Sequence, residues 1–276
     1  MENMLSRYKR QPKIYVDAPS QFKYIDDSVC SGESFKDIPV YSMTGADEIS
    51  MKTPEALLNG KAIKNLIQSC IPTVKDAGKL SSIDVEFFLT AIRIASYGQT
   101  YSKKSICEKC SEENSHDIDL TNFIDEYNKK EFKDTIVIED LKFYLKPLTY
   151  DEWNDIQLEL FQANRTLYQA MSKPDMTEDE KQQFQNSIQN IIQSINQKTV
   201  LYQVYKIKDG EVEETNTNNI RSFILESDRT FFTKLQNLIK ENTSTWDLPK
   251  LNLTCGGCGE EYHSVLSMDE ASFFAD

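Results

Sequence analysis

Two Cys-x-x-Cys pairs constrain this chain more than any other feature of its sequence. The first pair, CEKC, occupies residues 107–110 and the second, CGGC, occupies residues 255–258, so 144 residues lie between them. The chain contains six cysteines in all. If both pairs contribute to one site, the chain must leave that site at residue 111 and return to it at residue 254. The pairs therefore decide how distant parts of the chain come together.

Each pair lies in the same kind of local sequence: a β-like strand, a short turn of small or charged residues, and a returning strand. The two stretches are CEKCSEENSHDIDL and CGGCGEEYHSVLSM. This is the sequence form of a zinc knuckle, in which a tight turn directs two thiolates at one metal ion. A structural zinc takes four ligands in a tetrahedron. The sequence therefore predicts one shared structural zinc ion, with residues 111–254 as an insertion and with four ligands: Cys107, Cys110, Cys255 and Cys258.

Two other interpretations of the cysteine pairs remain open. A redox pair is expected to open a helix after a buried strand, and the glycines of CGGC make a poor helix start. The two histidines of the chain, His116 and His263, each follow a pair by a few residues. Two separate Cys-Cys-His sites are therefore a rival, although each lacks a fourth ligand. The shared four-cysteine site explains the sequence with fewer missing ligands.

Composition limits the partners that this chain can have. Of its 276 residues, 39% are hydrophobic and 27% are charged, and the formal net charge is −13. Nucleic-acid-binding proteins usually carry a basic face that neutralises phosphates, so nucleic acid is a disfavoured partner. No apolar run reaches the length of a signal peptide or a membrane span. We therefore expect synthesis in the cytoplasm, where thiols stay reduced.

The sequence does not predict an enzyme. Neither GxGxxG nor GxxxxGK[ST], the glycine-rich loops that cradle phosphates, is present. A zinc ion with four thiolate ligands has no open position for a substrate. Both histidines lie beside the cysteine pairs, which leaves no readable Ser-His-Asp or Cys-His arrangement elsewhere. We expect no small-molecule substrate.

The N-terminal half is expected to be an extended arm over residues 1–37 and a helical region with the first knuckle over residues 38–130. Residues 62–70 place Ile63, Leu66, Ile67 and Cys70 on one helical face, so Cys70 is expected to be buried. The stretch SSIDVEFFLTAIRIASYG predicts a helix that is buried nearly all round and is capped by Ser81 or Ser82. Asp84 is the expected capping-box partner of Ser81.

The second half is expected to be an insertion over residues 131–248, followed by the second knuckle and a C-terminal tail over residues 249–276. A β-hairpin turns at Glu139-Asp140, and Asp209-Gly210 predicts another. Between them, apolar residues at helical spacing predict two long antiparallel helices, Thr149–Met171 and Thr177–Tyr202. Shorter helices are expected at 218–226 and 229–241. The fold class is α+β: a zinc-ribbon-like pair of β-knuckles closing on an N-terminal helical region, with a long αα-hairpin insertion.

Several segments, taken in order, resemble a known family. They are TGADEISMKTPEALLNGKAIKNLIQSCIP, LSSIDVEFFLTAIRIASYG, the strand with CEKC, LKPLTYDEW and CGGCGEEYHSVLSMDEASFF. The series is similar to the baseplate hub proteins of contractile-tailed, T-even-like bacteriophages. The resemblance implies a structural or assembly protein of the hub, located in the virion tail after assembly in the host cytoplasm. Its implied partners are other hub subunits, the tape-measure protein and the spike.

The resemblance carries over no catalytic residues. The alternative function is that of a zinc-ribbon protein that binds nucleic acid or a transcription complex, which the net charge disfavours. The two long helices are poor in charge on their Gln- and Asn-rich faces. We therefore expect the outer face of this helical pair to touch a neighbouring subunit.

Overall fold

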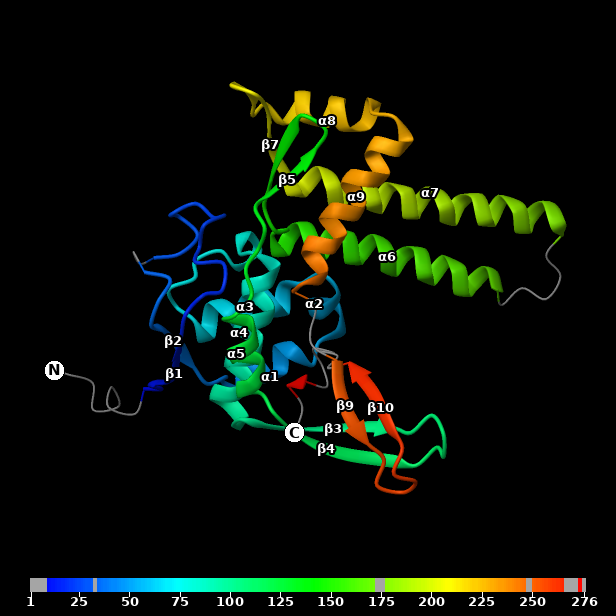
Figure 1. Cartoon of the computed structure of the whole chain (residues 1–276). Coiled ribbons are helices and arrows are strands. Elements are labelled where there is room, and N and C mark those ends of the chain that lie inside the picture. Colours follow the sequence, from blue (N-terminus) through cyan, green and yellow to red (C-terminus); the bar gives the residue numbers. More distant parts are fainter. Residues whose placement is uncertain (1–8, 32–33, 172–176, 247–249, 266–272, 275–276) are drawn as a thin grey trace. The chain divides into compact units, whose positions relative to one another are not determined.

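The computed structural model describes residues 9–31, 34–171, 177–246, 250–265 and 273–274. The chain divides into two units, Met1–Lys130 with Trp246–Asp276, and Glu131–Thr245. Both units combine helices with small antiparallel sheets, which confirms the expected mixture of helix and sheet (Figure 1). Within the described ranges, no helix has both the length and the apolar character needed to cross a membrane.

The first unit is built around one buried helix. Its helices are α1 (Gly45–Met51), α2 (Pro54–Leu58), α3 (Lys61–Cys70), the short 3₁₀ helix η2 (Ala77–Lys79), α4 (Ser82–Tyr97) and α5 (Thr121–Tyr127). Helix α4 has buried residues on every side, as its apolar sequence predicts. Ser81 caps it by accepting a hydrogen bond from the Ile83 N–H, and the chain leaves it at Gly98 with φ of 91°.

The described part of the N-terminal segment, expected to be an extended arm, packs into this unit. Strand β1 (Pro12–Val16) pairs antiparallel with β2 (Ile38–Tyr41). Further along, Cys30 forms an isolated β-bridge with Val74, and both are buried. Apolar side chains on both sides of the intervening turns favour this arrangement, because burying them removes apolar surface from water. The described part of the segment therefore contributes Val16, Ala18, Val29 and Cys30 to the core of the unit.

Asp84 does not form the predicted capping box. Its side chain is fully buried and accepts hydrogen bonds from the Ser20 N–H, at 3.0 Å, and from the Ser20 hydroxyl. The prediction from spacing was wrong because a backbone N–H and a hydroxyl from a distant segment offer the buried carboxylate two donors. Asp84 thus fastens the N-terminal segment to the first turn of α4.

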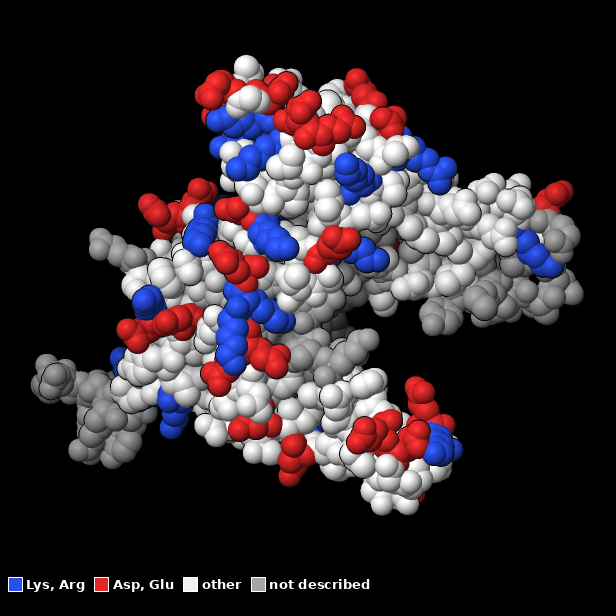
Figure 2. Space-filling model, viewed as in Figure 1, with Lys and Arg blue, Asp and Glu red and all other residues white. Residues whose placement is uncertain are grey.

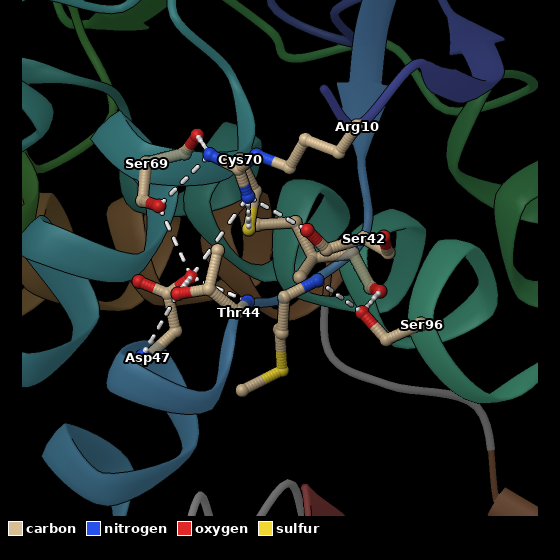
Figure 3. A network of polar contacts seen from close by, with 9 residues as sticks. Arg10, Ser42, Thr44, Asp47, Ser69, Cys70 and Ser96 are labelled. Carbon is tan, nitrogen blue, oxygen red and sulfur yellow. Dashed lines mark hydrogen bonds and ion pairs between the residues drawn. The ribbon is translucent and has the colours of Figure 1, made fainter. Parts of the chain in front are cut away.

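A second polar network fastens the same segment to α1 and α3 (Figure 3). The Arg10 guanidinium donates to the Ser42 carbonyl at 2.7 Å, and it donates to the carbonyl and hydroxyl of Ser69 in the last turn of α3. Asp47 lies 3.9 Å from this guanidinium, and it completes the capping box of α1 with Thr44. A cation at the end of α3 is also favoured by the helix dipole. One arginine therefore joins three elements.

The second unit contains a four-stranded antiparallel sheet in the order β5-β6-β7-β8. Its strands are β5 (Thr135–Ile138), β6 (Leu141–Leu145), β7 (Val204–Asp209) and β8 (Val212–Glu214). The sequence predicted the two hairpins separately, and pairing of β6 with β7 merges them. One face of the sheet packs on α8 (Thr217–Glu226) and α9 (Arg229–Ser244) through a buried apolar cluster that includes Phe143, Ile207 and Leu235.

Two long helices, α6 (Tyr150–Met171) and α7 (Glu178–Gln203), lie side by side within this unit (Figure 1). Each begins at the predicted threonine, which forms reciprocal capping hydrogen bonds with a glutamate three residues further on, Thr149 with Glu152 and Thr177 with Glu180. The predicted apolar stripes meet near the sheet end of the pair, where Leu148, Ile156 and Ile195 are buried together. The connection at 172–176 lies outside the described residues, as does the side chain of Met171.

Replacing Asp84 by asparagine is expected to stabilise the protein above neutral pH. Burial raises the pKa of Asp84 to about 6, although the bonds from Ser20 lower it. The stability gained by protonating this carboxyl is complete below its unfolded pKa of about 4, and it is lost as the pH rises through 6. An asparagine amide at this position can still bond Ser20, so Asp84→Asn should exceed the wild type by on the order of 2 kcal/mol at about pH 8 and match it near pH 4.

Urea unfolding of both proteins at the two pH values measures this difference. Asp27→Asn is the matched control. Asp27 is exposed, so its substitution should leave the free energy of unfolding unchanged at both pH values. A difference between Asp84→Asn and the wild type that does not change with pH would contradict the expected buried charge.

Candidate metal centre

The two cysteine pairs lie in the turns of two β-hairpins in the first unit. Strands β3 (Thr100–Ile106) and β4 (Glu113–Asp119) flank the first pair, and strands β9 (Lys250–Thr254) and β10 (Glu261–Val265) flank the second. Figure 1 shows the two hairpins crossing in view. In each hairpin the strands pair antiparallel up to the cysteine turn, which is why the turn is held at a fixed place.

The two turns have the same backbone geometry. In the first, the Cys107 N–H donates to the Glu112 carbonyl at 2.9 Å, and the Ser111 N–H donates back to the Cys107 carbonyl at 2.8 Å. In the second, Cys255 takes the same two bonds with Glu260 and Gly259, at 2.8 and 2.9 Å. The sequence predicted similar turns, and the structure makes them equivalent residue by residue.

One residue in each turn has a left-handed backbone conformation. It is Ser111 in the first turn, with φ of 60°, and Gly259 in the second, with φ of 71°. A glycine adopts this conformation without strain, whereas a residue with a Cβ does so at a cost. The turn thus requires a positive φ at the residue after its second cysteine. A serine takes this position in the first turn and a glycine in the second.

The four sulfur atoms of the pairs lie together. Cys110 Sγ is 3.5 Å from Cys255 Sγ, and Cys107 Sγ is 3.8 Å from Cys258 Sγ. All four lie within 4.8 Å of one another. A zinc ion with Zn–S bonds of about 2.3 Å in a tetrahedron would place its sulfurs about 3.8 Å apart. The cluster therefore fits a single tetrahedral metal ion. Both short sulfur–sulfur distances, Cys110–Cys255 and Cys107–Cys258, join one hairpin to the other.

Electrostatics also favour a cation among these sulfurs. Backbone N–H donors from Cys258 and Gly257, together with the Asn114 side chain, lower the pKa of Cys255 to about 6. The thiolate, which is the metal-binding form, is therefore favoured at Cys255 near neutral pH. For Cys110, the Glu112 N–H lowers the pKa but the facing sulfurs raise it more, to about 12. Four thiols this close lose all their protons readily only when a cation compensates their charge.

Asn114 bridges the two turns, a role that its sequence does not indicate. Its side-chain oxygen accepts from the Gly256 N–H at 2.8 Å. Its amide nitrogen donates to the Glu112 carbonyl at 3.0 Å and lies 3.6 Å from Cys255 Sγ. An asparagine at the start of a β-strand carries no signal of such a role, because its partners in the second turn lie more than 140 residues away. Asn114 orients the second turn on the first.

Neither histidine takes part in the sulfur cluster. His116 Nε2 lies 3.1 Å from the Tyr262 hydroxyl, which also contacts the Ser105 hydroxyl at 2.6 Å. His263 Nδ1 lies 2.7 Å from the side-chain oxygen of Asn252. The group of possible metal ligands that the described residues bring together contains the four cysteines alone. His116 instead adds a second polar bridge between the hairpins.

The remaining two cysteines are buried in the first unit, away from the cluster. Cys70 lies at the end of α3, as predicted, and burial raises the pKa of its thiol to about 12. Burial likewise raises the pKa of Cys30 to about 11. Both thiols therefore stay protonated and apolar in character at neutral pH.

Comparison with protein-family models matches residues 34–275 to the T4 bacteriophage base plate protein family. This chain belongs to that family. No curated protein and no solved structure matches it. The match spans both hairpins with their cysteine turns and the whole of the second unit. The protein is thus a structural component of the phage baseplate, located in the virion tail and acting among other phage proteins.

Substitutions at Ser111 and Gly259, the residues with a left-handed backbone conformation, test whether the two turns of this baseplate protein are equivalent. A Cβ at Gly259 meets nothing within 4 Å, so Gly259→Ala carries only the backbone cost. We expect it to lower the free energy of unfolding by about 1 kcal/mol. Ser111→Gly relieves the same strain and should leave stability unchanged or slightly higher, because glycine also loses more entropy on folding.

Urea unfolding with metal content held constant measures both effects. Gly45→Ala is a matched control for removing a glycine, since its Cβ also meets nothing within 4 Å and its φ is not left-handed. A Gly259→Ala protein as stable as the wild type would show that the second turn does not need a left-handed residue.

Proposed function

We propose that this baseplate protein is a subunit or assembly factor of the central hub, and that one structural zinc ion held by Cys107, Cys110, Cys255 and Cys258 maintains its fold. The observation that carries the proposal is the convergence of four sulfurs from two turns that are 144 residues apart. The resemblance of segments 44–72 and 80–98 to baseplate hub proteins supports the hub as its place.

Zinc is the metal that the ligand set favours. Four sulfur ligands in a tetrahedron suit zinc or an iron–sulfur centre, and paired knuckle turns are typical of structural zinc sites. Asn114 and the backbone N–H groups of the CGGC turn stabilise thiolate charge, which supports metal binding. When bound, zinc would supply a closed structural crosslink with no open position for a substrate.

A shared zinc ion would define the domain organisation of the chain. Residues 38–130 and 249–276 would form a helical base with a zinc ribbon, preceded by the N-terminal segment 1–37, and residues 131–248 would be an insertion. Closing so long a loop costs several kcal/mol of chain entropy by logarithmic scaling. Structural zinc binding contributes on the order of 10 kcal/mol in favourable peptides, which is enough to offset that cost.

The helical pair of the second unit is the proposed docking surface for a neighbouring hub protein. In Figure 2 the visible face of the pair carries few charged residues. A groove of about 660 Å³ runs between α7, α8 and α9, and Arg229 is the one charged residue among those that line it. Ile192 in this groove is 51% exposed, and Phe161 on α6 is 47% exposed. Charge depletion around exposed apolar side chains is typical of the core of a protein interface.

Breaking one cysteine turn should be as damaging as breaking both. Purified protein is expected to contain about one zinc ion per chain. Cys107→Ser, Cys255→Ser and the double variant should each lose the zinc and lose the same several kcal/mol of stability, because two remaining thiolates hold the metal weakly. Zinc content and thermal unfolding measure both losses, and cobalt substitution reports tetrahedral thiolate coordination.

Cys30→Ser serves as the control, since it removes a thiol outside the cluster and should leave zinc content unchanged. Additive, separable losses in the two single variants would instead indicate two independent sites. Finding no metal in protein purified without oxygen would contradict the zinc centre and leave the baseplate assignment intact.

A positive charge in the groove should impair assembly without unfolding the protein. We expect Gln193→Lys to weaken incorporation into hub complexes by about tenfold, because the new charge would be buried against a partner. Asn190→Lys, also on α7 but outside the groove lining, is the matched control. Incorporation is measured by sedimentation of reconstituted complexes, and thermal unfolding verifies the fold. Equal incorporation of both variants would exclude the groove as a docking surface.

A further inference from the structure

The sheet of the second unit has one face that its helices do not cover. Residues such as Phe143 and Ile207 point to the buried cluster, so their neighbours along the strands point the other way. The outward residues include Lys142, Tyr144, Lys206 and Lys208, and all are exposed or half-buried. Val137 on the same face is 60% exposed. This lysine–tyrosine face is cationic in a chain whose net charge is −13.

The distribution of these lysines is not the usual protection of a sheet edge. Lysines commonly lie on edge strands, where they prevent pairing with other chains. Here all three lie on the central strands β6 and β7, and the edge strands β5 and β8 carry none. Protection of the sheet edge therefore does not explain why the three lysines lie on the central strands.

The arrangement of the lysines is also unfavourable within the sheet. Lys142 lies directly opposite Lys208 in the register of β6 and β7, and like charges at such positions destabilise a sheet. Glu213 on β8 lies opposite Lys208 in the register and 3.6 Å from Lys206, so this one carboxylate lies beside two of the three lysines. Among the described residues, no ion pair is formed by Lys142 or Lys208. A repulsion of this kind is relieved when a negatively charged group binds across it.

Aromatic surface lies within the same face. The Lys206 ammonium is 4.1 Å and the Lys142 ammonium 5.2 Å from the centre of the Tyr144 ring. The Tyr205 ring, 44% exposed, contacts Tyr144 edge-on with centroids 6.3 Å apart. Tyrosines are enriched in binding interfaces because they offer apolar area with a polar end. The face therefore offers positive charge beside apolar surface.

We propose that the lysine–tyrosine face docks an acidic segment of another baseplate protein, with carboxylates against Lys142, Lys206 and Lys208 and an apolar or aromatic residue against Tyr144 and Tyr205. We infer an acidic partner because the face is cationic. We infer a protein because a baseplate protein acts among other phage proteins. This inference does not depend on the zinc centre or on the hub.

A protein segment fits this face better than nucleic acid does. The two turns at one end of the sheet carry four acidic residues: Glu139, Asp140, Asp209 and Glu211. Glu213 adds another carboxylate within the face. A phosphate backbone has one charge per nucleotide and would approach these carboxylates, whereas a short segment with two or three carboxylates can end before them.

Fluorescence anisotropy with two probes tests the proposal on the full chain. One probe is a labelled peptide of aspartate and glutamate with a central phenylalanine, and the other is oligothymidylate with the same number of charges. We expect the peptide to bind more tightly. Lys142→Glu combined with Lys208→Glu should weaken peptide binding by about tenfold or more. Lys234→Glu with Lys240→Glu, an equal charge change on α9, should change it by less than about twofold.

Two further variants separate the parts of the face. Tyr144→Ala should weaken peptide binding although it leaves the charge unchanged, and Tyr144→Phe should retain most of it. Lys142→Glu alone should raise the thermal stability, because it replaces the repulsion with a cross-strand ion pair to Lys208. Equal weakening by both lysine pairs would reduce the effect to net charge and overturn the proposal. Tighter binding of oligothymidylate that depends on Lys142 and Lys208 would assign the face to nucleic acid instead.

Discussion

The first unit depends on the contact between two short cysteine turns that 144 residues of the chain separate. Each turn is formed locally, by backbone bonds that close on its own first cysteine. Their meeting is not local: it brings Cys107 and Cys110 against Cys255 and Cys258, and it fixes where the chain must return after the second unit. The rest of the architecture has to satisfy that return.

The turns are joined by more than their sulfurs. Asn114 bonds the backbone of both turns, and Tyr262 lies between Ser105 and His116. These polar contacts hold the two hairpins together, and Asn114 also stabilises negative charge on Cys255. The arrangement corresponds to the outer-shell contacts that orient ligands in metal sites. A metal bound there would find its ligands already oriented, which lowers the entropy cost of forming the site.

The surfaces of the second unit suit a protein that works by contact. Its helical pair offers a face with few charges, and its sheet offers lysines beside tyrosines. For a chain of net charge −13, such regions are where another acidic protein can approach with least repulsion. The two surfaces differ in chemistry, so they would select different partners. This is what membership of a multi-protein baseplate would require.

The sequence by itself determined the local structure: the helix starts at Ser81, Thr149 and Thr177, the hairpin turns, and the form of both cysteine turns. Caps, turn residues and apolar periodicity act over a few residues, so they can be read from the chain. Only the tertiary structure decided that the N-terminal segment packs on the first unit through a few buried side chains, that Asp84 binds Ser20, that β6 pairs with β7, and that Asn114 bridges the turns. Each of these joins segments that are distant in the sequence. The donor, acceptor or strand edge that each polar group finds therefore depends on packing that no local pattern encodes.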